Sequence, residues 1–378
     1  MKSVLGRAVA VAASCLALAS FASPVFAAEP VRIGLMGPMT GSWASEGQEM
    51  KQVLDLLAEQ YNQAGGVLGR QIEILAEDDA GDPRTASLAA NRLVSRGVVA
   101  VIGTYGSSIT EASQSIFDEA EIVQIANGST AIRLSEKGLK YFFRTCPRDD
   151  DQGKVAAETI KKSGAKKVAI LHDNTSYAKG LAEESRDNLK AAGLEPVFFD
   201  ALTPHEMDYS AILTKLKAAG PDFVFYTGYY PEAGLLLKQK RAMGWDAPFM
   251  GGDAVNNPAL VETAGAAAEG FSFVSPPLPS DLDNEAAKGF VEAFTKKYGA
   301  APKSIYPVLA GDGLRALVEA IRGANSTDSD KIAAWLKNNL NDYPGLTGAL
   351  AFGPKGDRIG QVYRVYKVDA AGNFVLQP

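Results

Sequence analysis

The sequence predicts an α/β protein built from two doubly wound lobes, and three observations support this prediction. The chain has 378 residues, which is more than one hydrophobic core usually organises. Short β-branched runs alternate with amphipathic segments from residue 31 onward, as expected for parallel strands joined by helices. A second series with the same alternation begins at residue 167. We therefore expect two parallel sheets, each covered by helices on both faces.

The first series opens with two strand–helix units. Residues 31–36 form an expected buried strand, and apolar residues then recur at helical spacing until the glycine pair at 65–66. A strand at 71–76 follows. Asp82 and Pro83 come next and have the pattern of an N-cap followed by a proline at the first helical position.

The first series continues with two more expected strands, at 98–103 and 122–126. Between them lies an amphipathic segment that begins with Ser108 and Glu111, three residues apart. This spacing is typical of a capping box, in which each side chain satisfies a free backbone N–H of the other residue. We therefore expect a helix that starts at Ser108.

The rest of the chain is less regular. The polar stretch 144–153 lacks periodicity and suits a crossing between lobes better than a core element. The second series is expected to contain elements at 167–171, 177–192, 197–200 and 223–226. The last third shows helical patterns at 284–298, 308–322 and 330–340, then strand-like runs at 346–352 and 361–368, and these patterns alone do not assign them to a lobe.

The N-terminus has the pattern of a secretory signal peptide. Lys2 and Arg7 precede the apolar run 8–22, and the small-residue site 25–27 follows. We expect residues 1–27 to be removed and the remaining chain to be exported as a soluble protein. A membrane anchor is disfavoured because the run is shorter than the roughly 20 apolar residues that a spanning helix needs. A lipoprotein site at Cys15 ranks second.

Composition and motifs argue against several classes of protein. The net charge of −6 argues against a nucleic-acid partner, because phosphate contacts need clustered Lys and Arg. Glycine spacings for a dinucleotide or nucleotide cofactor are missing, as is a nucleophile elbow. With His172 and His205 far apart in sequence and Cys146 the only cysteine after residue 27, we expect no catalytic set, no cofactor, no metal site and no disulfide.

Five short segments carry a resemblance to a known family. They are GPMTG (37–41), GGVLG (65–69), DDAGDP (78–83), IGTYGSS (102–108) and YYPE (229–232), in this order. The chain resembles the leucine/isoleucine/valine-binding proteins of bacterial ABC importers over nearly all of its length after residue 27. Each segment alone is a weak signal, whereas the ordered series is specific.

The resemblance implies a type I periplasmic binding fold with three crossing segments and a cleft that closes by hinge motion. One lobe would contain residues 28–148 and 277–351, and the other 149–276 and 352–378. It also implies a periplasmic monomer that binds a free amino acid, branched-chain or similar aliphatic by preference, and hands it to a membrane permease. An amino-acid sensor for a receptor, an importer component for an aromatic acid or an amide, and an exported α/β enzyme remain alternatives.

The family's ligand contacts map onto single positions of this chain. Ser107 and Thr130 match the groups that bind the ligand carboxylate, while the Gly128 carbonyl and Asp253 match the partners of its ammonium. Independently, Ser107 lies between a strand end and a helix N-terminus, where free N–H groups favour an anion, although a plain N-cap serine would look the same. Two aromatic residues that would pack over the ligand match Tyr177 and Tyr229.

Departures from the family concern the part of the pocket that would hold the ligand's side chain. Glu46 stands in place of an aromatic residue, Tyr105 in place of an aliphatic one and Tyr306 in place of a phenylalanine. A carboxylate facing an aliphatic side chain would be poorly compensated, so either Glu46 points elsewhere or the ligand is polar or basic at that end. The family's small disulfide is also missing, because its two positions match Gly81 and Gly106.

Overall fold

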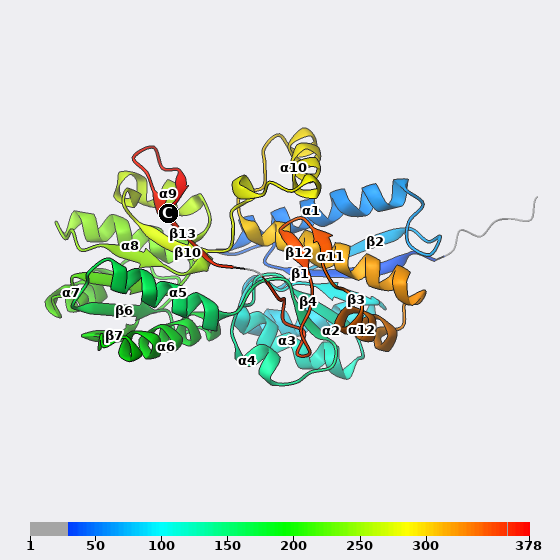
Figure 1. Cartoon of the computed structure of the whole chain (residues 1–378), viewed down its shortest axis with the longest axis horizontal. Coiled ribbons are helices and arrows are strands. Elements are labelled where there is room, and N and C mark those ends of the chain that lie inside the picture. Colours follow the sequence, from blue (N-terminus) through cyan, green and yellow to red (C-terminus); the bar gives the residue numbers. More distant parts are fainter. Residues whose placement is uncertain (1–28, 361) are drawn as a thin grey trace, which may run out of the picture.

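Two lobes lie side by side along the long axis of the molecule (Figure 1). The structure is a computed structural model that describes residues 29–360 and 362–378. The expected signal peptide, residues 1–27, lies outside the described residues and stays a prediction. Within the described part of the chain, no helix is both long and apolar enough to span a membrane.

The first lobe is built on a parallel sheet with the strand order β2-β1-β3-β4-β5. Strand β1 lies between β2 and β3; Val31 and Met36 at the two ends of its apolar run are fully buried, and Val31 pairs with Ile72 of β2. The order confirms the predicted doubly wound arrangement, because the chain moves outward from β1 and then returns to its other side. The strands are β1 (Val31–Gly37), β2 (Ile72–Asp78), β3 (Ala100–Ile102), β4 (Val123–Ala126) and β5 (Phe142–Arg144).

Helices from both ends of the chain cover this sheet. The early ones are α1 (Ala44–Gln63), α2 (Pro83–Ser95), α3 (Ser107–Glu119) and α4 (Arg133–Glu136). The late ones are α10 (Glu285–Tyr298), α11 (Ile305–Ala324) and α12 (Ser329–Asn338), followed by the hairpin β11 (Tyr343–Gly345) and β12 (Gly348–Leu350). Helix α11 packs against α1 and against strands β3 and β4, so the late helices lie on the first lobe.

The second lobe is built on a sheet with the order β14-β13-β10-β9-β8-β6-β7. Its parallel strands are β6 (Val168–His172), β7 (Phe198–Ala201), β8 (Phe223–Tyr226), β9 (Phe249–Gly251) and β10 (Ser272–Ser275). The hairpin β13 (Arg364–Val368) and β14 (Phe374–Leu376) extends it antiparallel. Its helices are α5 (Asp149–Lys162), α6 (Ser176–Ala191), α7 (Ser210–Ala218), α8 (Tyr230–Ala242) and α9 (Ala259–Ala264).

The chain passes from the first sheet to the second between β5 and α5, returns between β10 and α10, and passes again between β12 and β13. The first of these connections belongs to the polar stretch 144–153. The lobe boundaries expected at residues 148, 276 and 351 stay a prediction, because sheet membership does not fix the residue at which each connection changes lobe.

The two predicted helix starts had different outcomes. The Asp82 side chain accepts hydrogen bonds from the backbone N–H groups of Arg84 and Thr85, which confirms the predicted N-cap. The capping box was wrong: α3 starts one residue earlier, and its N-cap makes no side-chain hydrogen bond. The Ser108 hydroxyl instead accepts from the Ser176 N–H of the second lobe at 2.9 Å. A long-range partner has therefore replaced the local one.

Arg144, at the end of β5, connects segments that are far apart in the sequence. It is fully buried, and its guanidinium binds the Asp357 carboxylate at 2.6 Å. It also donates to the Ser129 and Ala131 carbonyls at 3.0 and 2.8 Å, and to the Ser135 hydroxyl at 2.8 Å. The loop after β4 is thus held to the connection that follows β12.

We predict that Arg144→Met lowers the free energy of unfolding by about 3 kcal/mol, because it leaves buried carbonyls and a carboxylate without their partner. Chemical denaturation followed by circular dichroism measures this. The control is Arg32→Met, which removes a half-exposed ion pair with Glu73 and should change stability by less than about 0.5 kcal/mol. Similar losses for the two variants would contradict the role given to Arg144.

Candidate ligand-binding site

With the exception of Tyr306 on α11, the predicted site residues follow the carboxyl ends of parallel strands in both sheets. In open α/β sheets these ends form the crevice where ligands bind, because the loops that leave neighbouring strands meet there. The side chains are all buried, with 2 % exposure or less. In the first lobe they are Glu46 after β1, Tyr105 and Ser107 after β3, Thr130 after β4 and Tyr306 on α11; in the second, Tyr177 after β6, Tyr229 after β8 and Asp253 after β9.

The loop after β4 is held rigidly from two sides. On one side Arg144 binds the carbonyls of Ser129 and Ala131. On the other, the Ser129 hydroxyl accepts a hydrogen bond from Thr110 at 2.7 Å. Between these anchors, the buried Thr130 hydroxyl lies beside the Asp149 carboxyl, on whose pKa it has a lowering effect, and it makes no hydrogen bond of good geometry within the described chain. It therefore has hydrogen-bonding capacity left for a ligand.

Ser107 belongs to the same part of the site. It is the first residue of α3, and its hydroxyl accepts a hydrogen bond from the Ala131 N–H at 3.2 Å. The structure thus places Ser107 and the Thr130 loop side by side, at the N-terminus of a 13-residue helix. The helix dipole and the first N–H groups of α3 favour an anion at this place.

Gly128 lies where two chain segments approach each other closely. A Cβ atom at this position would be 2.7 Å from the Tyr105 carbonyl oxygen and 3.1 Å from the Tyr306 ring. A side chain would therefore push the β4 loop away from its neighbours. The absence of a side chain at Gly128 is a packing requirement, in addition to the carbonyl role that the resemblance implies.

Asp253 lies directly after β9 and faces several polar side chains. Its backbone N–H donates to the Gln152 side chain at 2.8 Å, and Tyr363 donates to its carboxylate at 3.4 Å. Burial raises the pKa of Asp253 to about 6, against the lowering effect of hydrogen bonds from residues that include Tyr177 and Tyr306. Because Tyr306 belongs to the first lobe, Asp253 is bound from both sides of the cleft.

Asp149 is a second buried carboxyl of the site, and sequence reasoning missed it. One oxygen accepts from Gln152 at 3.1 Å, whereas the other has no hydrogen bond of good geometry within the described chain. Burial, together with the charge of Asp253, raises the pKa of Asp149 well above its usual range. The available signal was the polar run at 149–151, but three consecutive aspartates do not reveal which one turns inward.

Aromatic rings from both lobes meet in the cleft. Tyr229 stacks on Trp43 with ring centroids 4.1 Å apart, and it lies 5.9 Å from Tyr105 and 5.3 Å from Tyr177. Trp43 is another residue that sequence reasoning missed. One edge of its indole packs against Gly81 and against Gly106, which match the positions of the family's lost disulfide. Trp43 thus fills the space that these two glycines leave.

Glu46 joins the two lobes. Its carboxyl oxygens accept hydrogen bonds from Asn257 of the second lobe at 2.7 Å and from Ser304 of the first at 2.6 Å. The Asn257 orientation is determined, because its oxygen accepts from the Ala259 N–H and its NH₂ must therefore face Glu46. Burial raises the pKa of Glu46 to about 7. Protein side chains thus bind the carboxyl group of Glu46, so a polar or basic ligand is not needed to compensate it.

Further hydrogen bonds hold the lobes together around this site. The Tyr230 hydroxyl of the second lobe donates to the Ser42 carbonyl of the first at 2.9 Å. Ser176 of the second lobe binds Ser108, as described above, and its hydroxyl also donates to Glu111 at 2.8 Å. These contacts join the two lobes at two places. The conformation is therefore closed.

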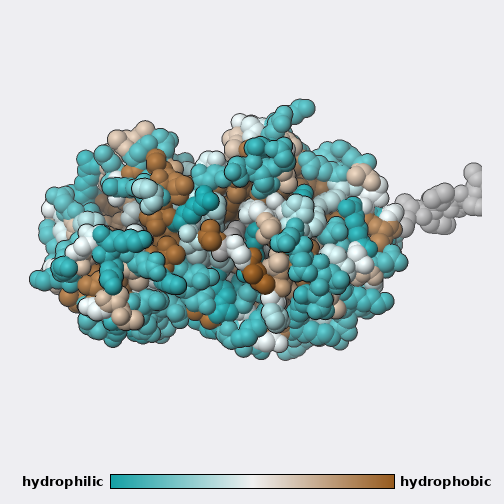
Figure 2. All heavy atoms as spheres, in the orientation of Figure 1, coloured by the Kyte–Doolittle hydropathy of each residue, from teal (hydrophilic) through white to brown (hydrophobic). Residues whose placement is uncertain are grey.

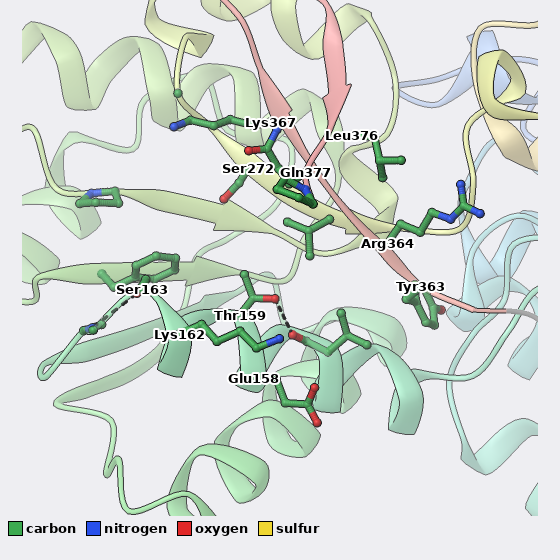
Figure 3. Close-up of a pocket in the computed structure, with 18 of the residues that line it drawn as sticks. Glu158, Thr159, Lys162, Ser163, Ser272, Tyr363, Arg364, Lys367, Leu376 and Gln377 are labelled. Atoms are coloured by element: carbon green, nitrogen blue, oxygen red, sulfur yellow. Dashed lines mark hydrogen bonds between the residues drawn. The ribbon is translucent and has the colours of Figure 1, made fainter.

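A groove lies on the second lobe, and one of the residues that line it, Tyr363, also donates to the site residue Asp253 (Figure 3). It has a volume of about 980 Å³, and its walls come mainly from α5, β13 and β14. Glu158 and Lys162 lie on one wall and Arg364 and Lys367 on the other (Figure 3). Figure 2 shows apolar residues on the surface of this lobe, close to where Figure 1 places β13. None of the site residues predicted from the sequence lines this groove.

Comparison with known proteins identifies the family. The family model described as periplasmic binding protein matches residues 30–373, so the chain belongs to the periplasmic binding protein family. The resemblance to leucine/isoleucine/valine-binding proteins and the type I fold are thereby confirmed. The family consists of solute-binding proteins of transporters, which catalyse no reaction, and the chain is accordingly not an enzyme.

Several relatives match along nearly their whole length. The leucine-, isoleucine-, valine-, threonine- and alanine-binding protein of Pseudomonas aeruginosa is 36% identical, with 94% of each chain covered. The Leu/Ile/Val-binding protein of Escherichia coli is 35% identical, covering 96% of this chain and 97% of the relative. A leucine-binding protein from Thermotoga maritima, 29% identical, has a TM-score of 0.85 over 92% of this chain and 98% of that one.

We predict that Glu46→Gln changes how stability depends on pH. The unfolded chain releases the Glu46 proton near its ordinary pKa of 4.5 and the folded chain near 7, so the wild type loses stability as pH rises through this window. Glutamine has no proton to lose and can still bind Asn257 and Ser304. From pH 5 to pH 8 the variant should gain on the order of 2 kcal/mol relative to the wild type.

The measurement is urea denaturation of both proteins at the two pH values. Glu73→Gln, a change at a half-exposed carboxylate, serves as the control. Its free energy of unfolding should differ from that of the wild type by the same amount at both pH values. A Glu46→Gln difference that does not vary with pH would show that Glu46 keeps an ordinary pKa in the fold.

Proposed function

We propose that this protein is the substrate-binding component of an amino-acid ABC importer. The N-terminal leader directs the protein to the periplasm, where it acts as a monomer. There it captures a free L-amino acid between its lobes and delivers this ligand to a membrane permease. One observation carries the proposal. Two buried carboxyls, Asp149 and Asp253, lie in the same closed cleft as the anion-favouring group of Ser107 and Thr130.

The carboxylate of the ligand binds on the first lobe. The N-terminal turn of α3 supplies N–H groups, and Ser107 and Thr130 supply hydroxyls beside it. The β4 loop is already held in place by Arg144, so it has little conformational freedom to lose when the ligand binds. This preorganisation favours tight binding of a small anion.

The ammonium of the ligand binds between the lobes. Asp253 and Asp149 are both removed from water, and each raises the energetic cost of ionising the other. A cation placed between them relieves this cost, because a buried charge is tolerated when it is paired and hydrogen-bonded. An aromatic acid without an ammonium would leave the buried Asp253 carboxylate uncompensated. A ligand of the amino-acid class is therefore favoured over that alternative.

Closure around the ligand creates the form that the permease receives. Contacts between the lobes at Tyr230 and at Ser176 surround the site, so release requires the lobes to separate. A related structure supports the transport role: the branched-chain amino acid transporter substrate-binding protein of Streptococcus pneumoniae, in complex with isoleucine, is 30% identical, with a TM-score of 0.81 over 92% of this chain and 99% of that one.

We predict that Asp253→Asn weakens amino-acid binding about 100-fold or more, because the amide keeps the shape of the side chain but cannot balance a buried ammonium. Isothermal titration calorimetry with the amino acid that most raises the melting temperature of the wild type measures this. Asp246→Asn, a change at an exposed carboxylate of the same lobe, should leave affinity unchanged. Wild-type affinity in the Asp253 variant would refute the assigned ammonium site.

We also predict that affinity for the amino acid depends on pH. Asp253 in the ligand-free protein has a pKa of about 6, and only its ionised form pairs with an ammonium. Affinity should be constant near pH 7.5 and then fall by up to about tenfold per pH unit below pH 6. Titrations between pH 7.5 and pH 5 measure the profile. A flat profile in the wild type would show that the ammonium does not depend on this carboxylate.

A further inference from the structure

The part of the cleft expected to hold the ligand's side chain is largely filled by aromatic rings. Tyr105 of the first lobe meets the Tyr306 ring edge-on at 5.0 Å between centroids. It also lies edge-on to Trp43 at 5.6 Å, while Trp43 stacks on Tyr229 of the second lobe. Rings in such direct contact leave little room between them for a long side chain. This packing favours a ligand with a short side chain.

Two polar atoms in this ring cluster have no partner. Neither the indole N–H of Trp43 nor the hydroxyl of Tyr105 makes a hydrogen bond to any residue of the described chain, although both are buried. The opposite edge of the indole packs against Gly81 and Gly106, so the N–H edge is directed away from these glycines. Buried polar groups are nearly always hydrogen-bonded, which points to a missing partner at this end of the cleft.

The charge around these atoms limits what that partner is. Burial raises the pKa of Tyr105 well above its usual range, and the nearby charge of Glu46 raises it further, as does that of Asp253. An acidic side chain would be repelled by these carboxyls. The close packing of the rings disfavours the long side chain of a lysine or an arginine. A neutral side chain with a hydrogen-bonding group satisfies both limits.

We propose that the ligand is an amino acid with a short hydroxyl-bearing side chain, of the serine or threonine kind, and that Trp43 and Tyr105 select it. This proposal rests on the proposed function of the same site. The oxygen of a ligand hydroxyl has two lone pairs, so it accepts hydrogen bonds from both the Trp43 N–H and the Tyr105 O–H. A site built in this way discriminates against an analogue that lacks the hydroxyl, since its polar atoms are then left unpaired.

Matched ligand pairs test the proposal on the wild-type protein. Threonine and valine have nearly the same shape and differ in the hydroxyl, and serine differs from alanine by the hydroxyl alone. Calorimetric titration should give threonine an affinity about tenfold or more above that of valine, with serine above alanine. Leucine should bind more weakly than threonine because of its size. Valine equal to or better than threonine overturns the proposal.

The second test removes only the Tyr105 hydroxyl. Tyr105→Phe keeps the ring and its contacts with Trp43 and Tyr306, and it should lower the threonine-to-valine affinity ratio by about fivefold. Tyr298→Phe removes a hydroxyl that is bonded to the Gln52 carbonyl and should leave the ratio unchanged. The melting temperature of each ligand-free variant shows that it is folded. An unchanged ratio in folded Tyr105→Phe overturns the role of Tyr105.

Failure of the proposed function looks different from failure of this inference. If none of the amino acids binds the wild type, the proposed function is wrong and the side-chain preference fails with it. If amino acids bind and Asp253→Asn abolishes their binding, while threonine and valine bind equally, the amino-acid site stands and the hydroxyl-selecting role of Trp43 and Tyr105 is wrong.

Discussion

The buried guanidinium of Arg144 is the interaction on which the site depends. Its donors bind the carbonyls on both sides of Thr130 and the carboxylate of Asp357, which lies in the connection between β12 and β13. Burial of this charge is tolerated because nearly every donor has an acceptor within the fold. Arg144 therefore links the loop that receives the ligand carboxylate to a connection between the lobes. The same side chain stabilises both the binding site and this connection.

The second constraint is electrostatic. Asp149, Asp253 and Glu46 are all buried in this structure. Glu46 is satisfied by Asn257 and Ser304, one from each lobe, whereas the two aspartates have mainly neutral donors around them. Within the described chain, the two aspartates therefore lack a cationic partner, and the Trp43 N–H and Tyr105 hydroxyl lack a hydrogen-bond partner. An amino acid with a small polar side chain provides an ammonium for the aspartates and a polar group for the other two. Ligands that lack either group are therefore disfavoured in the closed form.

Local sequence patterns were reliable where the partner of a residue is also local. Asp82 caps its helix because the acceptor and the N–H donors lie within three residues. Ser108 and Glu111 had an equally good local pattern, and it failed because Ser176, far away in sequence, offered them better partners. Asp149 could not be told from its two neighbouring aspartates for the same reason: only the packing of α5 decides which one faces the cleft.

The sequence by itself determined the two α/β lobes, the strand ends from which the site loops leave, and the family, because alternation and ordered motifs are properties of the chain alone. It also named eight of the buried side chains around the cleft through the resemblance. Only the tertiary structure decided that Glu46 is engaged across the lobes, that Asp149 joins Asp253, and that Trp43 fills the space beside Gly81 and Gly106. These outcomes depend on contacts between residues distant in sequence, and no local pattern encodes such contacts.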